Sequence, residues 1–304
     1  MKRILLVVVM VWAAACGGPA SNSAPPKKKV IGVTLLTATH AFYKDLEAGL
    51  RDEAAVKGFD LVVRACEMDP TKQASQIEDF VAQRVSAILA APCDSDAIVP
   101  ALASPQLAGI PVFTADIAAH GGSVVAHVAS DNMQGGRMAA DALAGYLDGK
   151  GKIIIIDHPT VASAQDRVKG FEDEMKKYPG ITIVAKPSSE GQREAAARIM
   201  EDMLQAHPDL RGVFGINDDS ALGATGVIEA AKRTDIAVVG FDASDEARTA
   251  IQKGGPLKAE VIQYPKKIGQ VAIDLIADYL DGKKVPPVTS LEVGMMDAKS
   301  ISGK

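Results

Sequence analysis

Short apolar segments that end in a polar residue and lead into a helical pattern constrain the fold of this 304-residue chain most. Residues 213–216 are apolar and stop at an Asn-Asp-Asp triplet at 217–219, where a pattern of small residues typical of a helix begins. Asn and Asp satisfy the free N–H groups at a helix start. The apolar run is too short for a helix and predicts a buried parallel strand. The same order of features recurs at 110–116 and 237–242.

Predicted strands and helices alternate along nearly the whole chain, which indicates parallel sheets wound by right-handed crossovers. The strands are apolar throughout, as in sheets buried on both faces. About a dozen strands exceed one comfortable sheet of this type, so we predict an α/β fold of two similar, doubly wound lobes. The predicted strands are 30–36, 59–64, 87–91, 110–115, 124–128, 152–156, 181–186, 213–216, 237–241, 257–262 and 289–295. The predicted helices are 42–57, 71–84, 94–108, 133–147, 164–177, 194–206, 220–232, 245–253 and 267–281.

The first residues have the pattern of an export signal: two basic residues, an apolar run over 4–12 and then small residues. The segment is too short to span a bilayer permanently. Residues 13–16, AAAC, resemble a bacterial lipoprotein processing site, which implies that Cys16 becomes lipidated. We therefore predict a signal peptide over 1–15. Residues 16–29 have almost no apolar content and predict a flexible tether.

Composition and motifs exclude several functional classes. The net charge of −5 gives no reason to expect a nucleic-acid partner. The chain has no phosphate loop, no GxGxxG after a strand, no GxSxG and no HExxH. Its five histidines do not pair with one another, with Cys or with carboxylates at a ligand spacing, so we predict no metal site and no cofactor.

Cys66 and Cys93 are expected to be free, buried or half-buried thiols. They belong to no CxxC or metal-binding spacing. Both follow strands that we expect to flank a third strand. That arrangement places them too far apart for a disulfide without distortion.

Polar and aromatic side chains gather at the predicted strand ends, which is where open α/β sheets bind ligands. Carboxylates accept hydrogen bonds from paired hydroxyls, Arg and amide groups donate, and aromatic faces contact C–H groups, so the set has the chemistry of a neutral sugar site. Taken singly, each residue is explained as well by a helix cap, a core position or a solvated surface. The candidate binding residues are His40, Phe42, Tyr43, Asp116, Arg167, Asn217, Asp242 and Gln263.

Several longer segments, in this order, resemble the periplasmic sugar-binding proteins of ABC importers. They are 42–54 (FYKDLEAGLRDEA), 92–98 (PCDSDAI), 127–136 (HVASDNMQGG), 205–224 (QAHPDLRGVFGINDDSALGA), 238–242 (VVGFD) and 262–269 (IQYPKKIG). The resemblance implies two lobes joined by a hinge of three chain crossings. It places the N-terminal lobe at 30–130 plus 264–288 and the C-terminal lobe at 131–263 plus 289–304.

By matched position, the resemblance implies that Phe42 and Tyr43 sandwich the sugar ring. His40 stands where the ribose-binding members of the family have an Asn. Two positions depart from the pattern: Ile117 occupies the site of an Arg, and Gly191 replaces an aromatic ring. The pocket is therefore expected to be less cationic and roomier on one side. The hydrogen-bonding positions of the family match Asp116, Arg167, Asn217, Asp242 and Gln263.

The resemblance implies a monomeric, lipid-anchored protein at the periplasmic or cell-surface face of a membrane. It would capture a monosaccharide or polyol between its lobes, hand it to an ABC permease and catalyse no reaction. A sensory protein that presents a sugar or a signalling furanone to a membrane receptor would use the same binding chemistry. A glycosidase with Asp116 and Asp242 as its carboxyl pair is a weaker alternative. A transcriptional repressor core shares the fold, but an export signal rather than a helix-turn-helix precedes residue 30.

Overall fold

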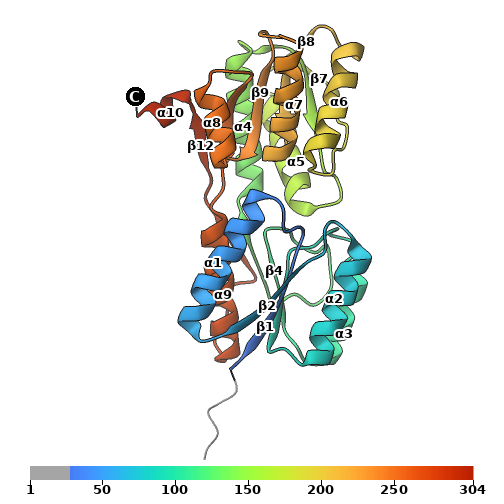
Figure 1. Cartoon of the computed structure of the whole chain (residues 1–304), viewed down its shortest axis with the longest axis vertical. Coiled ribbons are helices and arrows are strands. Elements are labelled where there is room, and N and C mark those ends of the chain that lie inside the picture. The colour runs from blue at the N-terminus through green and yellow to red at the C-terminus, as the bar shows by residue number, and fades with distance from the viewer. Residues whose placement is uncertain (1–27, 304) are drawn as a thin grey trace, which may run out of the picture.

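The computed structural model describes residues 28–303, so the predicted signal peptide, Cys16 and the tether up to residue 27 lie outside the described residues. Two six-stranded sheets form two lobes that follow one another along the long axis of the molecule (Figure 1). Within residues 28–303, we find no helix with both the length and the apolar character needed to cross a membrane.

The first lobe contains an all-parallel sheet with the strand order β2-β1-β3-β4-β5-β11. Helices α1 and α9 pack together on one side of this sheet, and α2 and α3 lie on the other (Figure 1). Its strands are β1 (Val30–Leu35), β2 (Asp60–Ala65), β3 (Ala87–Ala90), β4 (Val112–Ala115), β5 (Ala126–Ser130) and β11 (Val288–Leu291). Its helices are α1 (Ala41–Lys57), α2 (Pro70–Gln83), the 3₁₀ turn η1 (Val99–Leu102), α3 (Ala103–Leu107) and α9 (Pro265–Leu280).

The second lobe repeats this winding with the order β7-β6-β8-β9-β10-β12, in which only β12 runs antiparallel to its neighbour. Its strands are β6 (Lys150–Ile156), β7 (Gly180–Ala185), β8 (Leu210–Gly215), β9 (Ala237–Asp242), β10 (Leu257–Ile262) and β12 (Gly294–Asp297). Its helices are α4 (Asn132–Tyr146), α5 (Ala162–Met175), α6 (Arg193–Ala206), α7 (Asp218–Ala230), α8 (Asp245–Gln252) and α10 (Ala298–Ser302). The shared winding confirms the predicted fold class of two doubly wound lobes.

The chain passes between the lobes three times: after β5, after β10 and between β11 and β12. The third crossing falls at Glu292-Val293, slightly later than the predicted lobe boundary after residue 288. Residues 288–291 stay in the first lobe because they pair in parallel with β5 and extend the edge of its sheet.

The predicted helix over 94–108 is wrong. This stretch forms the short turn η1 followed by the five-residue helix α3. Pro100 and Pro105 lie in the first turn of each piece, where no backbone N–H is required. In one continuous helix both would be interior residues that break the hydrogen-bond ladder.

Candidate ligand-binding site

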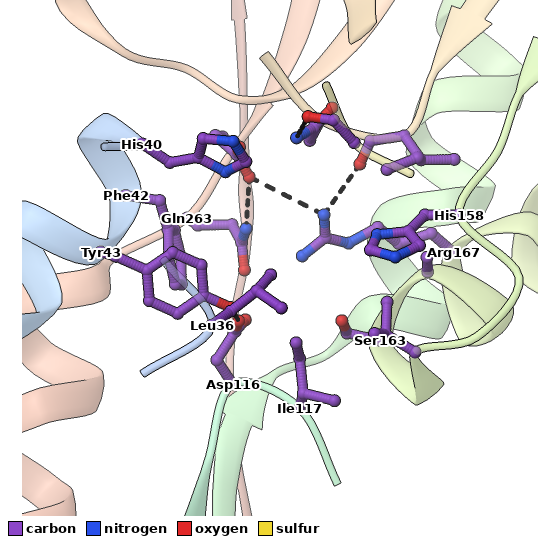
Figure 2. Close-up of a pocket in the computed structure, with 16 residues that line it drawn as sticks. Leu36, His40, Phe42, Tyr43, Asp116, Ile117, His158, Ser163, Arg167 and Gln263 are labelled. Carbon is purple, nitrogen blue, oxygen red and sulfur yellow. Dashed lines mark hydrogen bonds and ion pairs between the residues drawn. The ribbon is translucent and has the colours of Figure 1, made fainter. Parts of the chain in front are cut away.

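One cavity between the lobes is lined by all eight of the predicted binding residues (Figure 2). The space between its lining atoms is about 420 Å³, open solvent included. The residues meet because the carboxyl ends of both parallel sheets face the space between the lobes. Whether each residue contacts a ligand stays a prediction.

The first-lobe wall of the cavity, defined here as Leu36, Phe42, Tyr43, Asp116 and Ile117, is mainly apolar and aromatic. The Phe42 and Tyr43 rings meet edge to face with centroids 5.2 Å apart. The Tyr43 hydroxyl donates a 2.6 Å hydrogen bond to Asp116 Oδ2, and both side chains are buried. Burial raises the pKa of Asp116, while the Arg167 guanidinium and the Tyr43 hydrogen bond act to lower it.

The second-lobe wall, defined here as His158, Ser163, Arg167, Asn217 and Asp242, is polar. Its central residue is Arg167 on α5. The Arg167 Nε donates a 2.8 Å hydrogen bond to Asn132 Oδ1, and one of its terminal nitrogens donates a 2.8 Å hydrogen bond to the Ile216 carbonyl. Its guanidinium lies 3.9 Å from the centre of the Phe241 ring. Any side chain at position 136 on α4 would collide with the Arg167 carbonyl oxygen, so Gly136 allows the close packing of α4 on α5 that places this arginine.

Asp242 ends β9 beside Arg167, with 3.8 Å between its Oδ1 and an Arg167 terminal nitrogen. Gln263, on the second chain crossing, donates a 2.6 Å hydrogen bond from Nε2 to Asp242 Oδ1. The backbone N–H of Asp218 donates to Asp242 Oδ2 at 3.3 Å. Burial raises the pKa of Asp242, and Arg167 opposes this effect. The Asp242 carboxyl group is thus held in one position without any ligand.

Asn217 and His40 lie where the two lobes approach each other. Asn217 caps α7 through a 3.0 Å bond from Ser220 N–H to its Oδ1, and its Nδ2 donates to the Gly191 carbonyl at 3.0 Å. His40 precedes α1, and its Nε2 lies 3.3 Å from Asp219 Oδ2 of the second lobe. Burial lowers the pKa of His40, while Asp219 acts to raise it. Asn217 is therefore both a helix cap and a residue that lines the cavity.

The lobes also touch at Ser95, which follows β3 in the first lobe. Its N–H donates to the Thr160 carbonyl at 3.0 Å, and its Oγ accepts a 2.9 Å hydrogen bond from the Ala162 N–H. Thr160 and Ala162 follow β6 in the second lobe. The cleft is therefore bridged by direct contacts in this structure.

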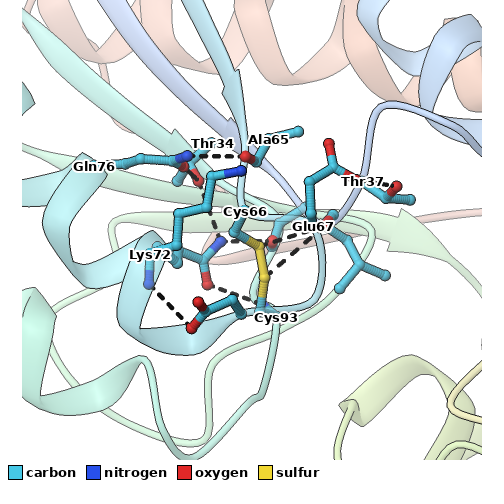
Figure 3. The surroundings of a disulfide bond; sticks show 12 residues. Thr34, Thr37, Ala65, Cys66, Glu67, Lys72, Gln76 and Cys93 are labelled. Carbon is cyan, nitrogen blue, oxygen red and sulfur yellow. Dashed lines mark hydrogen bonds between the residues drawn. A yellow bond between two sulfur atoms is a disulfide. The ribbon is translucent and has the colours of Figure 1, made fainter.

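The structure contradicts the expectation of free thiols, because Cys66 and Cys93 form a disulfide (Figure 3). The predicted strand order is right, with β1 between β2 and β3. Each cysteine, however, lies past the end of its strand, where the two loops converge over the end of β1 and bring the Cα atoms to 6.8 Å. The strand-to-strand spacing used in the prediction, about 10 Å for flanking strands, does not apply there. Next to the disulfide, the Leu36 carbonyl accepts a hydrogen bond from the Met68 N–H, and Cys66 Sγ lies 3.4 Å from the same oxygen.

A periplasmic binding protein domain model matches residues 31–284. The chain belongs to the periplasmic binding protein family. The ribose import binding protein of Bacillus subtilis is 36% identical over 261 residues, covering 86% of this chain and 84% of that protein. The D-apiose import binding protein of Paraburkholderia graminis is 30% identical over 252 residues, covering 82% and 80%. A solved ABC transporter solute-binding protein of Mycobacterium smegmatis with bound glycerol has a TM-score of 0.86 and 34% identity, covering 91% of this chain and 96% of that one.

These relatives are transport binding proteins rather than enzymes. They place this periplasmic binding protein among the sugar and polyol solute-binding proteins of ABC transporters. Within residues 28–303, no group of three or more His, Cys, Asp or Glu side chains has an arrangement that could hold a metal ion.

His158 is a cavity residue of this periplasmic binding protein that the sequence analysis missed. It follows β6 and lies beside Arg167 in the cavity (Figure 2). A Cβ atom at Gly191, whose φ is 70°, would lie 3.4 Å from His158 Nδ1 and 3.2 Å from Asn217 Nδ2. The imidazole therefore occupies part of the side that Gly191 was expected to open. Burial lowers the pKa of His158 to about 4, so the ring is neutral at neutral pH. The strand-end sequence Asp-His-Pro was the available signal.

Proposed function

We propose that this periplasmic binding protein captures a monosaccharide or polyol between its lobes and delivers it to the transmembrane subunits of an ABC importer. The observation that carries the proposal is a cavity in which an apolar aromatic wall faces a wall of carboxyl, guanidinium and amide groups. Sugars carry C–H faces and a rim of hydroxyls, which match these two walls. Family membership and the ligands named for the relatives support the same class of ligand.

The ligand is expected to be electrically neutral. Among residues 28–303, Arg167 is the one Lys or Arg side chain that lines the cavity, and Asn132, the Ile216 carbonyl and, at 3.8 Å, Asp242 contact its Nε and one terminal nitrogen. Ile117 offers no charge where an arginine would. A phosphate or carboxylate on the ligand would therefore face two carboxyl groups and, among the described lining residues, a single guanidinium that already lies beside one of them. Neutral sugars and sugar alcohols avoid this cost.

Binding is coupled to a hinge motion in this proposal. Ligand contacts come from both lobes, so a ligand stabilises the closed arrangement by contacts that an open one lacks. The three chain crossings supply the hinge. Contacts across the cleft, such as that between His40 and Asp219, add to the stability of the closed form. The permease would then recognise the closed protein and receive the sugar.

Anchoring to a membrane is a separate part of the proposal. We expect residues 1–15 to be removed, Cys16 to be lipidated, and the tether to hold the monomeric binding domain near the permease. Mass spectrometry of the mature N-terminus checks this, with Cys16→Ser as the comparison. An unmodified mature protein that begins beyond Cys16 would contradict it.

A ligand screen tests the binding function. The soluble domain is heated with D-ribose, D-apiose, xylitol, myo-inositol and D-tagatose, with ribose 5-phosphate as the charged control. A neutral ligand at about a hundred times its Kd adds about 2.7 kcal/mol of stability, whereas the phosphate ester adds none. The same ligand should reduce the radius of gyration in solution scattering and be recovered unchanged. Turnover of the sugar, or preferential stabilisation by the phosphate ester, would overturn the proposal.

A further inference from the structure

A second pair of carboxyl groups lies next to Asp242 in the interior of the second lobe. Glu260 on β10 is 0% exposed, and Asp218 at the start of α7 is 8% exposed. Glu260 Oε2 accepts a 2.8 Å hydrogen bond from the Ala243 N–H. Asp218 Oδ2 accepts a 3.2 Å hydrogen bond from the Ser244 N–H. Each carboxyl group therefore holds one residue of the loop that follows Asp242.

The other oxygen of each group lacks a donor. Glu260 Oε1 and Asp218 Oδ1 are buried and have no hydrogen-bond partner within residues 28–303, although the two side chains lie within hydrogen-bonding reach of each other. No ion pair in this described part of the chain joins either group to a Lys or Arg. Two adjacent ionised carboxylates without a cation are strongly disfavoured in a protein interior. A single proton between the two free oxygens satisfies both.

We propose that Glu260 stays protonated at neutral pH, donates its O–H to Asp218 and thereby positions Asp242 for ligand binding. Burial raises the pKa of Glu260 well above its usual value, and the neighbouring Asp218 and Asp242 raise it further. The effect on affinity rests on the proposed sugar-binding function, whereas the protonation of Glu260 does not.

The loop that carries Asp242 needs such support. Asp242 has φ 107° and Ala243 has φ 62°, conformations that cost free energy in residues other than glycine. Glu260 fixes the Ala243 N–H, Asp218 fixes the Ser244 N–H, and the Asp218 N–H reaches the Asp242 carboxylate. The shared proton thus ties β10 and the start of α7 to the ligand-facing loop.

The sheet leaves room for the Glu260 carboxyl group. A Cβ atom at Gly240 on the neighbouring strand β9 would collide with Glu260 Oε1. The titratable groups nearest to Glu260 are Asp218 from α7 and Asp242 from β9, and the charged Arg167 from α5 is paired with Asp242. Loss of the proton at alkaline pH would leave two adjacent carboxylates beneath the binding loop. Affinity should therefore fall as pH rises through the pKa of Glu260.

Carboxyl ¹³C NMR of the whole soluble domain tests the protonation directly and needs no ligand. The Glu260 signal is identified by its absence in Glu260→Gln. It should keep the chemical shift of a protonated acid from about pH 5 to 8, far above the ordinary glutamate pKa of about 4.3. A signal that titrates near the ordinary value would overturn the proposal.

The pH profile of affinity tests the positioning role, with the neutral panel sugar that stabilises the protein most as the probe. Glu260→Gln keeps a donor toward Asp218, so it should bind within a few-fold of wild type at neutral pH and lose the alkaline decline. Glu260→Leu removes the donor and should weaken binding by about tenfold at neutral pH. Glu229→Gln, an exposed change on α7, should behave as wild type. An alkaline decline that persists unchanged in Glu260→Gln would overturn the positioning role. Failure of every panel sugar to bind wild type would instead count against the proposed function.

Discussion

The two walls of the cleft differ in how their side chains are held. On the first-lobe wall, one polar contact joins Tyr43 to Asp116, and the surrounding side chains are apolar. On the second-lobe wall, Arg167 is held by Asn132 and lies beside Asp242, and Gln263 on the second chain crossing donates a hydrogen bond to Asp242. The second-lobe wall therefore presents oriented hydrogen-bonding groups, while the first supplies a surface for C–H contacts.

This difference indicates where affinity and specificity arise. Burying an apolar face contributes free energy in proportion to area and tolerates changes of ligand shape. Removing a preorganised carboxyl group costs far more binding free energy, because the buried hydroxyl groups of the ligand are then left without hydrogen-bond partners. Substitutions on the two walls should consequently differ in how much they weaken ligand binding.

The largest effect is expected for Asp242→Ala. Loss of this carboxyl group should cost about 2–5 kcal/mol of binding free energy, which is about thirty- to several-thousand-fold in Kd. Calorimetry with the best panel sugar measures it, and Asp245→Ala, an exposed change on α8, is the matched control. Asp116→Ala on the other wall should cost less. Equal losses for Asp116→Ala and Asp242→Ala would remove the asymmetry between the walls.

The next effect concerns stability rather than binding. The Cys66–Cys93 disulfide closes a loop with a sequence separation of 27, so replacing both cysteines with Ala should lower the free energy of unfolding by about 3–4 kcal/mol. Because this disulfide lies in the first lobe, hydrogen exchange should speed up there and change little in the second lobe. A uniform loss of protection in both lobes would contradict this assignment.

Each lobe also contains a buried histidine that should make its stability depend on acid pH. Burial lowers the pKa of His127 in the first lobe and of His158 in the second to about 4. The unfolded chain takes up protons below about pH 6.5, whereas the folded protein does not until about pH 4, so each histidine lowers stability as pH falls through that window. The loss is on the order of 1–3 kcal/mol per histidine. It is measured as the difference between wild-type and variant unfolding curves.

His158→Gln and His127→Gln serve as paired variants for that experiment. Each should flatten the acid side of the stability curve. Only His158→Gln should also change sugar affinity, because His127 bonds to Thr114 within the first sheet and lies outside the cavity. A change in affinity for His127→Gln of the same size would mean that the effect is transmitted through overall stability.

The smallest effect is expected for Phe42→Leu on the first-lobe wall. This change keeps an apolar surface and removes the aromatic face, which should cost about 0.5–1.5 kcal/mol, or about two- to twelve-fold in Kd. Tyr279→Leu, a half-exposed aromatic on α9 outside the cavity, is the control. A loss as large as that of Asp242→Ala would show that the ring, and not the polar network, dominates recognition.

The architecture and the candidate site could both be predicted from the sequence, because each depends on local patterns. Alternating apolar strands and helices have few ways to bury their faces, and parallel winding sends every strand end to the same edge. Asp116, Asn217 and Asp242 therefore meet in one cavity, although long stretches of chain separate them.

Other features were decided only by the tertiary structure, because they depend on distances between loops that no local pattern contains. Cys66 and Cys93 pair because two loops converge past their strands. His158 lines the cavity because the loop after β6 brings its ring next to Gly191. Glu260 would be an ordinary strand residue by its sequence, but burial beside Asp218 without a cation changes its protonation. Local sequence patterns thus placed eight of the lining residues at the strand ends that face the cleft, whereas packing added His158 and decided the partners and charges.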